Sequence, residues 1–458
     1  MASNFTEKAV VRQSLTAVIS LMVVLHMGIC LGYSAVLIPQ LRTKESLLKI
    51  TNSESSWIAS SNTVFMSVGS LFTGILMDNY GRKRALQLTY IFLFFGWIII
   101  FRADSVLALY LGRIITGLAT GMDSVAVVYI VETSTLQYRA MFLSWMTPII
   151  MFGVLLSYML GHFLFWKYSA LILSFFSGVC FIQVFIIPES PSWLLSKNRI
   201  EEAVKSLKWF RVDPQYIFVE MKELQASMLQ FENCLEKTSI IEKIKLTRAW
   251  KPFILLTIYF CLTQFSGDNI IISHAVNFYQ SFDTPIDPFT STLIFISLRL
   301  FSSLIFLIII GKFNNKSLIV FSGTGVSISY LLAAVYQYLY GSAENKPMFW
   351  FPLVCVWSSV IFTSLGLSNM SWILGGELFP SSVRGFMSSL LWTTFYILMF
   401  SAIQIYPSLE NYVRTSDILL IFSINALLST LFVKYTLPET RGKTLTEIEK
   451  FWRNDVNL

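Results

Sequence analysis

The sequence predicts an all-α membrane protein with twelve transmembrane helices in two six-helix bundles, joined by a cytoplasmic helical linker. Three observations support this prediction. The 458-residue chain is 55% hydrophobic and only 13% charged, with a mean hydropathy of +0.63, whereas about a quarter of the residues in a soluble domain are charged. Apolar stretches long enough to cross a hydrocarbon core of about 30 Å recur along almost the whole chain. One polar stretch divides them into two sets of six.

The first set of spans begins directly after a polar N-terminus. The apolar segment that starts after Arg12 runs to Pro39 without the short apolar core and small-residue cleavage site of a signal peptide. We therefore expect it to remain as the first span. Apolar windows bounded by charged or turn-forming residues place the six spans at residues 14–39, 57–77, 85–101, 106–130, 141–162 and 168–187.

The polar stretch over residues 188–251 is rich in lysine and glutamate. Amphipathic patterns over residues 201–210 and 219–231 predict helices in it, which gives a helical linker. Lys and Arg are more numerous in the connections on the side of the membrane that holds the N-terminus, as the positive-inside rule requires of cytoplasmic connections. We therefore expect the linker and both chain termini to lie in the cytoplasm.

The second set of spans follows the linker. The same criteria place these spans at residues 252–280, 289–311, 317–340, 349–374, 386–406 and 416–437. The chain is then expected to divide into an N-terminal bundle at residues 1–189, the linker at 190–251, a C-terminal bundle at 252–440 and a cytoplasmic tail at 441–458.

Two motifs occur once in each half. Glu132 precedes Arg139 by seven residues, just as Glu377 precedes Arg384. The tripeptide Pro188-Glu189-Ser190 follows the sixth span, and Pro438-Glu439-Thr440 follows the twelfth. Repeated halves are typical of transporter folds in which two bundles rock around a central site.

Further motifs lie at the ends of the spans. They are Asp78-x-x-Gly81-Arg82-Lys83, Arg113-x-x-x-Gly117, Tyr129-x-x-Glu132, Pro188-Glu189-Ser190-Pro191-x-Trp193, Gln264-x-Ser266-Gly267-x-Asn269, Trp372-x-x-x-x-Glu377-x-Phe379-Pro380-x-x-x-Arg384-Gly385 and Pro438-Glu439-Thr440-Arg441-Gly442-Lys443-Thr444. In this order they resemble the sugar porter family of the major facilitator superfamily over essentially the whole chain. Within that family the sequence is similar to the insect facilitated trehalose transporters.

The resemblance implies a cytoplasmic gate made of ion pairs. Its members would be Arg82, Glu132, Arg139, Glu189, Glu377, Arg384 and Glu439. Such pairs strengthen as water leaves a closed interface, and they must break when the halves separate. The alternative is that these residues only stabilise the loops.

The resemblance also implies a substrate site of uncharged hydrogen-bonding side chains, because sugar hydroxyls bound out of water need partners. Gln264 and Asn269 match the family's second glutamine and its asparagine. Two family glutamines are replaced here by Thr263 and Thr147. Trp372 and Trp392 are retained. In the tenth span, residues 368–371 read Ser-Asn-Met-Ser, without the two helix-breaking prolines of the family's pattern.

Two departures from the family's pattern are charged. Arg299 stands where the family has a pocket asparagine, and Asp268 replaces an apolar residue directly before Asn269. An unpaired charge at mid-membrane costs about 2.5–3.5 kcal/mol on insertion scales. We therefore predict that Asp268 and Arg299 form an ion pair at or beside the substrate cavity. The alternative is that the two charges face water separately.

The resulting functional prediction is facilitated diffusion of trehalose or a hexose by alternating access. Proton-linked sugar porters carry an aspartate after the Gly-Tyr pair of the first span, where this chain has Ser34. The alternatives are a diverged homologue that acts as a sensor, and a carrier of an anionic or other non-sugar solute.

Other classes of protein are disfavoured. The cysteines and histidines have no metal-binding spacing, and no nucleophile or acid–base pair is recognisable, so we expect neither an enzyme nor a cofactor. The net charge of +7 comes from residues in the connections and the linker, which suits the inner membrane surface rather than nucleic acid. We expect a plasma-membrane protein, monomeric in the lipid bilayer.

Overall fold

The structure is a computed structural model that describes residues 2–42, 48, 50–211, 217–218, 221, 247–310, 312–341, 343, 347–379 and 384–437. Every regular element in these ranges is a helix. Ten of the helical segments are long and apolar enough to cross a membrane. The prediction of an all-α membrane protein is therefore confirmed.

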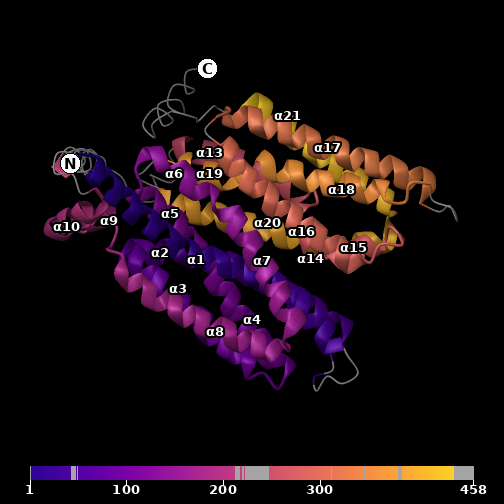
Figure 1. Cartoon of the computed structure of the whole chain (residues 1–458), viewed down its shortest axis with the longest axis horizontal. Coiled ribbons are helices and arrows are strands. Elements are labelled where there is room, and N and C mark those ends of the chain that lie inside the picture. The colour runs from indigo at the N-terminus through magenta and orange to yellow at the C-terminus, as the bar shows by residue number, and fades with distance from the viewer. Residues whose placement is uncertain are drawn as a thin grey trace.

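The N-terminal half contains the helices coloured indigo to magenta in Figure 1. They are α1 (Ala2–Arg42), α2 (Asn52–Tyr80), α3 (Arg82–Phe101), α4 (Val106–Thr120), α5 (Ser124–Thr133), α6 (Leu136–Ser144), α7 (Met146–Phe163) and α8 (Trp166–Gln183). Helix α1 packs along α7, and α3 packs along both α4 and α8. Helices α4 and α5 together make the predicted fourth span, with the short 3₁₀ turn Gly121–Asp123 between them.

The C-terminal half contains the orange to yellow helices (Figure 1). They are α13 (Thr247–Gln264), α14 (Asp268–Ser273), α15 (Ala275–Gln280), α16 (Pro288–Ile309), α17 (Asn315–Tyr340), α18 (Phe351–Phe362), α19 (Asn369–Glu377), α20 (Arg384–Tyr412) and α21 (Thr415–Thr436). The closest packing within this half is between α17 and α21.

The two halves meet along several pairs of helices, of which three make the most extensive contacts. Helix α2 packs on α20, α7 on α16, and α6 on α19. In Figure 1 the halves approach at the end that carries α6, α13 and α19, and they diverge toward the opposite end. The core continues across the contact between the halves, because one continuous set of buried apolar side chains includes residues from both.

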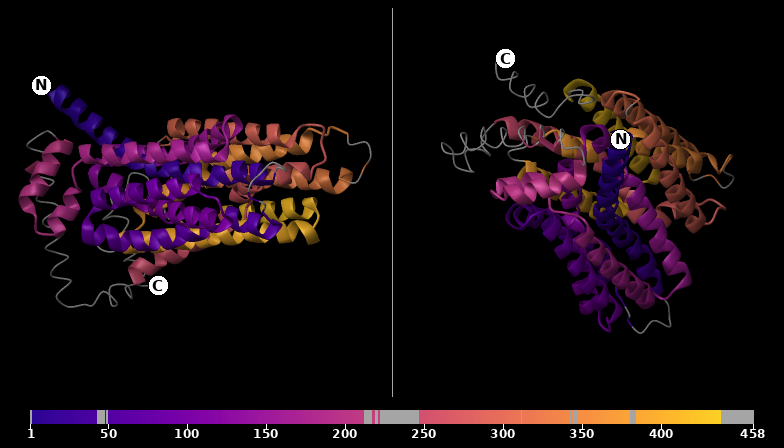
Figure 2. Two further views of the ribbon diagram at one scale, coloured as in Figure 1. Left: turned by 90° about the horizontal axis from the view of Figure 1, so that it is seen from below. Right: turned by 60° about the vertical axis from the view of Figure 1, so that its left-hand side comes forward.

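The linker helices α9 (Pro191–Ser196) and α10 (Ile200–Arg211) lie beside the N-terminal end of α1, as the two views in Figure 2 show. The Arg12 guanidinium donates to the Trp209 carbonyl at 3.0 Å and lies over the Trp209 ring. Arg211 donates to the Thr133 carbonyl at 2.7 Å. The helix predicted over residues 201–210 is thus confirmed. The helix predicted over 219–231 and the tail 441–458 lie outside the described residues, apart from Met221.

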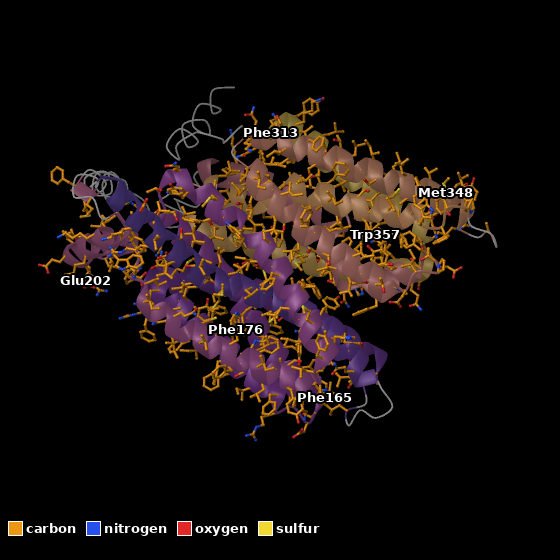
Figure 3. All side chains as sticks on the ribbon, in the orientation of Figure 1. Phe165, Phe176, Glu202, Phe313, Met348 and Trp357 are labelled. Atoms are coloured by element: carbon orange, nitrogen blue, oxygen red, sulfur yellow. The ribbon has the colours of Figure 1, made fainter. Side chains whose placement is uncertain are left out.

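Large apolar side chains cover the outer surface of both bundles. Phe165 and Phe313 are exposed on opposite halves (Figure 3), and Phe175 on α8 is 75% exposed. In water such a surface would be strongly unfavourable, whereas lipid chains solvate it. Glu202, by contrast, lies on the exposed face of linker helix α10 (Figure 3).

Most of the predicted spans agree with the helices to within a few residues, but α1 begins at Ala2, well before the predicted start at residue 14. Besides the fourth span and the fifth, which is divided into α6 and α7 at Trp145, two spans of the C-terminal half are not continuous α-helices. The seventh span turns at Gly267, whose φ of +96° is left-handed, so α13, α14 and α15 replace one helix. The tenth span contains the π-helical turn Thr363–Leu367 between α18 and α19. The absence of the family's two prolines at residues 368–371 therefore does not make this span one uninterrupted α-helix.

Side chains of neighbouring helices stabilise the π-helical turn. The Ser322 hydroxyl donates to the Phe362 carbonyl at 2.7 Å and accepts from the Leu367 N–H at 2.8 Å. The Tyr259 hydroxyl donates to the Leu367 carbonyl at 2.5 Å. These bonds satisfy backbone groups that an α-helical ladder would pair internally, which is how helix breaks are tolerated at membrane depth.

Candidate binding site

A small, partly open pocket lies where the two broken spans of the C-terminal half face each other. Its lining residues come from the ends of α13 and α14, the π-helical turn, α19 and α20. They are Thr263, Gln264, Ser266, Asp268, Asn269, Thr363, Leu367, Ser368, Ser371, Trp372 and Phe395. Seven of these carry an uncharged hydroxyl or amide, so the wall is rich in hydrogen-bonding groups without net charge.

The two amides predicted as leading ligands lie side by side across the turn in the seventh span. The Asn269 amide nitrogen donates to the Gln264 side-chain oxygen at 2.8 Å. The turn brings them together because Gly267 can adopt its positive φ without strain. A Cβ atom at Gly267 would also lie 2.5 Å from the Phe422 ring, so the glycine is required for packing as well.

The predicted ion pair between Asp268 and Arg299 is confirmed. Both guanidinium NH groups of Arg299 donate to the two carboxylate oxygens of Asp268, and the second of these contacts is 2.6 Å long. The residues are 8% and 3% exposed, so the pair is almost completely out of solvent. Arg299 also reaches the Ser368 hydroxyl at 3.4 Å. A bidentate pair of this kind leaves no net charge beside the pocket.

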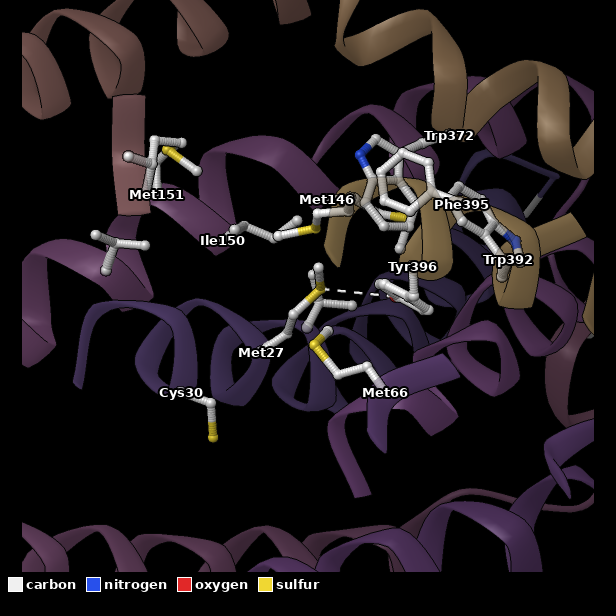
Figure 4. Close-up of a cluster of buried hydrophobic side chains, with 14 of the residues drawn as sticks. Met27, Cys30, Met66, Met146, Ile150, Met151, Trp372, Trp392, Phe395 and Tyr396 are labelled. Carbon is white, nitrogen blue, oxygen red and sulfur yellow. Dashed lines mark hydrogen bonds between the residues drawn. The ribbon is translucent and has the colours of Figure 1, made fainter. Parts of the chain in front are cut away.

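Aromatic rings form the remaining wall of the pocket. Trp372 stacks on Trp392 with ring centroids 4.2 Å apart, and Phe395 packs against both. Figure 4 shows this cluster facing Met146 and Ile150 of the N-terminal half. Aromatic faces stack on the C–H faces of apolar and ring-shaped ligands and exclude water from the site.

The structure brings most of the predicted substrate ligands together. Gln264, Asn269, Thr263, Asp268 and Trp372 line the pocket. Arg299 and Trp392 lie behind this wall, because they contact Asp268 and Trp372 respectively. Thr147 lies on α7 of the other half and is not among the lining residues. Its hydroxyl has no hydrogen-bond partner within the described part of the chain.

Sequence reasoning missed several pocket residues. Ser266, Thr363, Ser368, Ser371 and Phe395 line the pocket but were not predicted. The segment around Ser368 and Ser371 did carry a signal, since Asn369 and Ser371 stand there in place of the two prolines of the family's pattern. Thr363 and Phe395 carried none, because the π-helical turn and the contact with α20 are tertiary features.

The predicted gate is present in part. Arg82 pairs with Glu132 at 2.8 Å, and Glu132 also accepts a hydrogen bond from the Ser190 hydroxyl. Glu189 accepts from the backbone N–H groups of Arg82 and Lys83 at 2.9 and 3.1 Å. Burial raises the pKa of the Glu189 carboxyl, while these backbone hydrogen bonds oppose the shift. These contacts tie the loop after α2 to the end of α5 and the start of the linker.

The other gate residues are only partly described. Arg139 lies on α6, the helix that meets α19 of the other half. Glu377 ends α19 and Arg384 begins α20, but their side chains lie outside the described residues, as does the whole of Glu439. The described ion pair is contained in the N-terminal half, so gating across the halves stays a prediction.

The chain is similar to proteins of known function over nearly its whole length. The sequence model of the sugar (and other) transporter family matches residues 2–452. The facilitated trehalose transporter Tret1 of Bombyx mori is 27% identical over 428 residues, which are 93% of this chain and 84% of that protein. The protein of the same name from Apis mellifera ligustica is 26% identical over 446 residues, which are 97% and 89% of the two chains.

Solved structures with the same fold include two of a bacterial sugar transporter. The proton:xylose symporter XylE of the major facilitator superfamily, bound to 6-bromo-6-deoxy-D-glucose, superposes with a TM-score of 0.81 at 18% identity, covering 98% of this chain and 99% of the other. The inward-open conformation of XylE from E. coli gives a TM-score of 0.71 at 20% identity, covering 96% and 99%. The fold is therefore that of the major facilitator proteins.

Proposed function

Because the chain belongs to the sugar (and other) transporter family, we propose that it carries a neutral sugar, trehalose or a hexose, by facilitated diffusion through alternating access. Trehalose is the substrate in the names of the Bombyx mori and Apis mellifera ligustica relatives. A hexose remains the second candidate, since both sugars offer only neutral hydroxyl groups to the pocket.

The observation that carries the proposal is the pairing of Arg299 with Asp268. Among the described lining residues Asp268 is the one with a formal charge, and the bidentate contact with Arg299 neutralises it. An anionic solute would need an available cation to offset its desolvation. The pocket instead offers Gln264, Asn269 and several hydroxyls, which suit a polyhydroxylated neutral solute. This favours a sugar over the anionic alternative.

Transport without proton coupling is supported by the surroundings of Arg113. This buried arginine donates to the carbonyls of Cys30 and Ile58 and to the Ser34 hydroxyl. Ser34 is the position where the resemblance places an aspartate in proton-linked relatives. With backbone carbonyls and a hydroxyl as its partners, Arg113 needs no titrating carboxylate at that position.

Alternating access assigns roles to the two bundles and to the gate. The bundles, taken as residues 1–189 and 252–440, would rock about the pocket, with residues 190–251 as the linker and 441–458 as a tail. Arg82, Glu132 and Glu189 would close the cytoplasmic side together with Arg139, Glu377, Arg384 and Glu439. The linker and both termini would then be cytoplasmic, in a monomer that resides in the plasma membrane and needs no cofactor or nucleic acid.

Ligand binding to the purified protein tests the proposed substrate class. We expect trehalose or glucose, but not the anion gluconate, to raise the melting temperature, because a ligand that binds only the folded state stabilises it. Asn269→Ala is expected to weaken this binding about 10- to 100-fold, since it removes hydrogen-bonding capacity from the pocket wall.

A matched control is Asn425→Ala, because the Asn425 amide bonds only within its own helix, to the Ile421 carbonyl, in the contacts described here. Stabilisation by gluconate and by neither neutral sugar would contradict the proposal and favour the anionic alternative.

A further inference from the structure

A further charged residue lies inside the membrane region, besides the charges that the sequence analysis singled out. Asp123 is in the 3₁₀ turn between α4 and α5, in the middle of the fourth span, and it is completely buried. Its Oδ1 atom has no hydrogen-bond partner within the described part of the chain. A buried carboxyl group at this depth is costly and therefore indicates a functional role.

The partner of Asp123 comes from the other half of the protein. The hydroxyl of Tyr396, on α20, donates to the Asp123 Oδ2 atom at 2.5 Å. The two residues are 273 positions apart in the sequence. Tyr396 is also completely buried, and its hydroxyl lies 3.9 Å from the Met27 sulfur (Figure 4). The contact therefore crosses from one bundle to the other through a dry, apolar environment.

Tyr396 is connected to the pocket by ring contacts. Its ring packs edge-on against Phe395 with centroids 5.5 Å apart. Phe395 lines the pocket and contacts Trp372 and Trp392. Figure 4 shows Trp372, Phe395 and Tyr396 as one group of rings above Met27 and Met66. The position of Tyr396 thus determines how the aromatic wall of the pocket stands against the N-terminal half.

Separation of the halves at α20 would expose both partners. The Met27 sulfur, 3.9 Å from the Tyr396 hydroxyl, is a weaker acceptor than the Asp123 carboxylate, so the hydrogen bond between Asp123 and Tyr396 favours the arrangement in which α20 rests on the N-terminal half. In that arrangement α6 also meets α19, so the halves are in contact at the linker end.

We propose that Asp123 is a positioning residue for transport, which holds Tyr396 and the aromatic wall of the pocket against the N-terminal half while the linker end is closed. We call the hydrogen bond between Asp123 and Tyr396 the latch, and its role rests on the proposed alternating access. The hydrogen bond forms in the closed arrangement and breaks when the linker end opens, so it sets the balance between the two states without touching the substrate.

The test measures opening of the linker end without any sugar. In a background in which the five native cysteines are replaced by alanine, a cysteine introduced as Ser144→Cys, buried on α6, is labelled by a membrane-impermeant maleimide added from the linker side. We expect Tyr396→Phe, which removes only the hydroxyl, to raise the labelling rate roughly threefold to tenfold, the range that one net hydrogen bond gives. Asp123→Ala should raise the labelling rate to a similar extent, because it removes the acceptor of the same hydrogen bond. Asp123→Asn should label close to the parent rate, because the amide oxygen still accepts from Tyr396.

Two comparisons separate a latch from general loss of packing. Tyr90→Phe is the matched control, since the buried Tyr90 hydroxyl donates to the Ile19 carbonyl within the N-terminal half, and its labelling should not change. The double variant Asp123→Ala with Tyr396→Phe should label no faster than either single variant. Unchanged labelling in Tyr396→Phe, or effects that add in the double variant, would overturn the latch. Since the assay needs no substrate, the labelling result would remain valid even if the protein proved not to transport a sugar.

Discussion

Replacing either Asp268 or Arg299 alone is expected to abolish folding or transport, whereas replacing both with asparagine is expected to restore much of it. Each single change, Asp268→Asn or Arg299→Asn, leaves one buried charge without its bidentate partner. Breaking a buried pair in this way costs about 3–5 kcal/mol, whereas replacing both charges by neutral groups is often tolerated. Surface-expressed protein and uptake of radiolabelled sugar per expressed molecule are the quantities to measure.

The chain offers a matched control for this experiment. Asp104 pairs with Lys167 at 2.7 Å, but its side chain is 87% exposed. Asp104→Asn should therefore leave expression and uptake nearly unchanged, because exposed ion pairs contribute little. If the double variant at positions 268 and 299 is as inactive as the single variants, the pair does more than neutralise charge, and our account of it fails.

Gly267→Ala is expected to reduce transport by at least about tenfold. A left-handed backbone costs a residue with a Cβ atom about 1–2 kcal/mol, and the new atom would lie 2.5 Å from the Phe422 ring, which is itself buried. If the backbone moved to relieve the left-handed conformation or the contact with Phe422, Asp268 and Asn269 would move away from Gln264. Sugar binding and uptake should both fall, while the protein still reaches the membrane.

The control for that substitution is Gly178→Ala on α8. A Cβ atom there would meet its nearest neighbour, Phe94, at 3.6 Å, which is an ordinary contact. Gly178→Ala should transport like the parent. Full activity of Gly267→Ala would show that the turn in the seventh span is not needed to assemble the pocket.

Much of the fold could be predicted because its signals are local. The apolar length of each span and the charges between spans placed the helices to within a few residues. Residue type alone also predicted the contact between Asp268 and Arg299, since two charges in apolar segments need each other. Gln264 and Asn269 were recognised as candidate ligands from a motif within six residues of sequence, whereas the hydrogen bond between them is a finding of the structure.

The features that escaped prediction depend on tertiary contacts. The backbone groups of the π-helical turn in the tenth span are hydrogen-bonded by Ser322 and Tyr259 from other helices, so the sequence of the span itself did not indicate the turn. Asp123 was overlooked because its partner Tyr396 lies in the other half, 273 residues away. Amphipathic periodicity predicted linker helix α10, but could not predict that Arg12 holds it against α1.

The central claim is that this chain moves a neutral sugar through the pocket of its C-terminal half. Uptake of radiolabelled trehalose and glucose into oocytes, with surface expression measured for each variant, tests it most directly. The account predicts saturable uptake of at least one of these sugars, lost in Asn269→Ala and retained in Asn425→Ala. No uptake of either sugar by protein that is present at the surface would contradict it, and so would uptake that Asn269→Ala leaves unchanged.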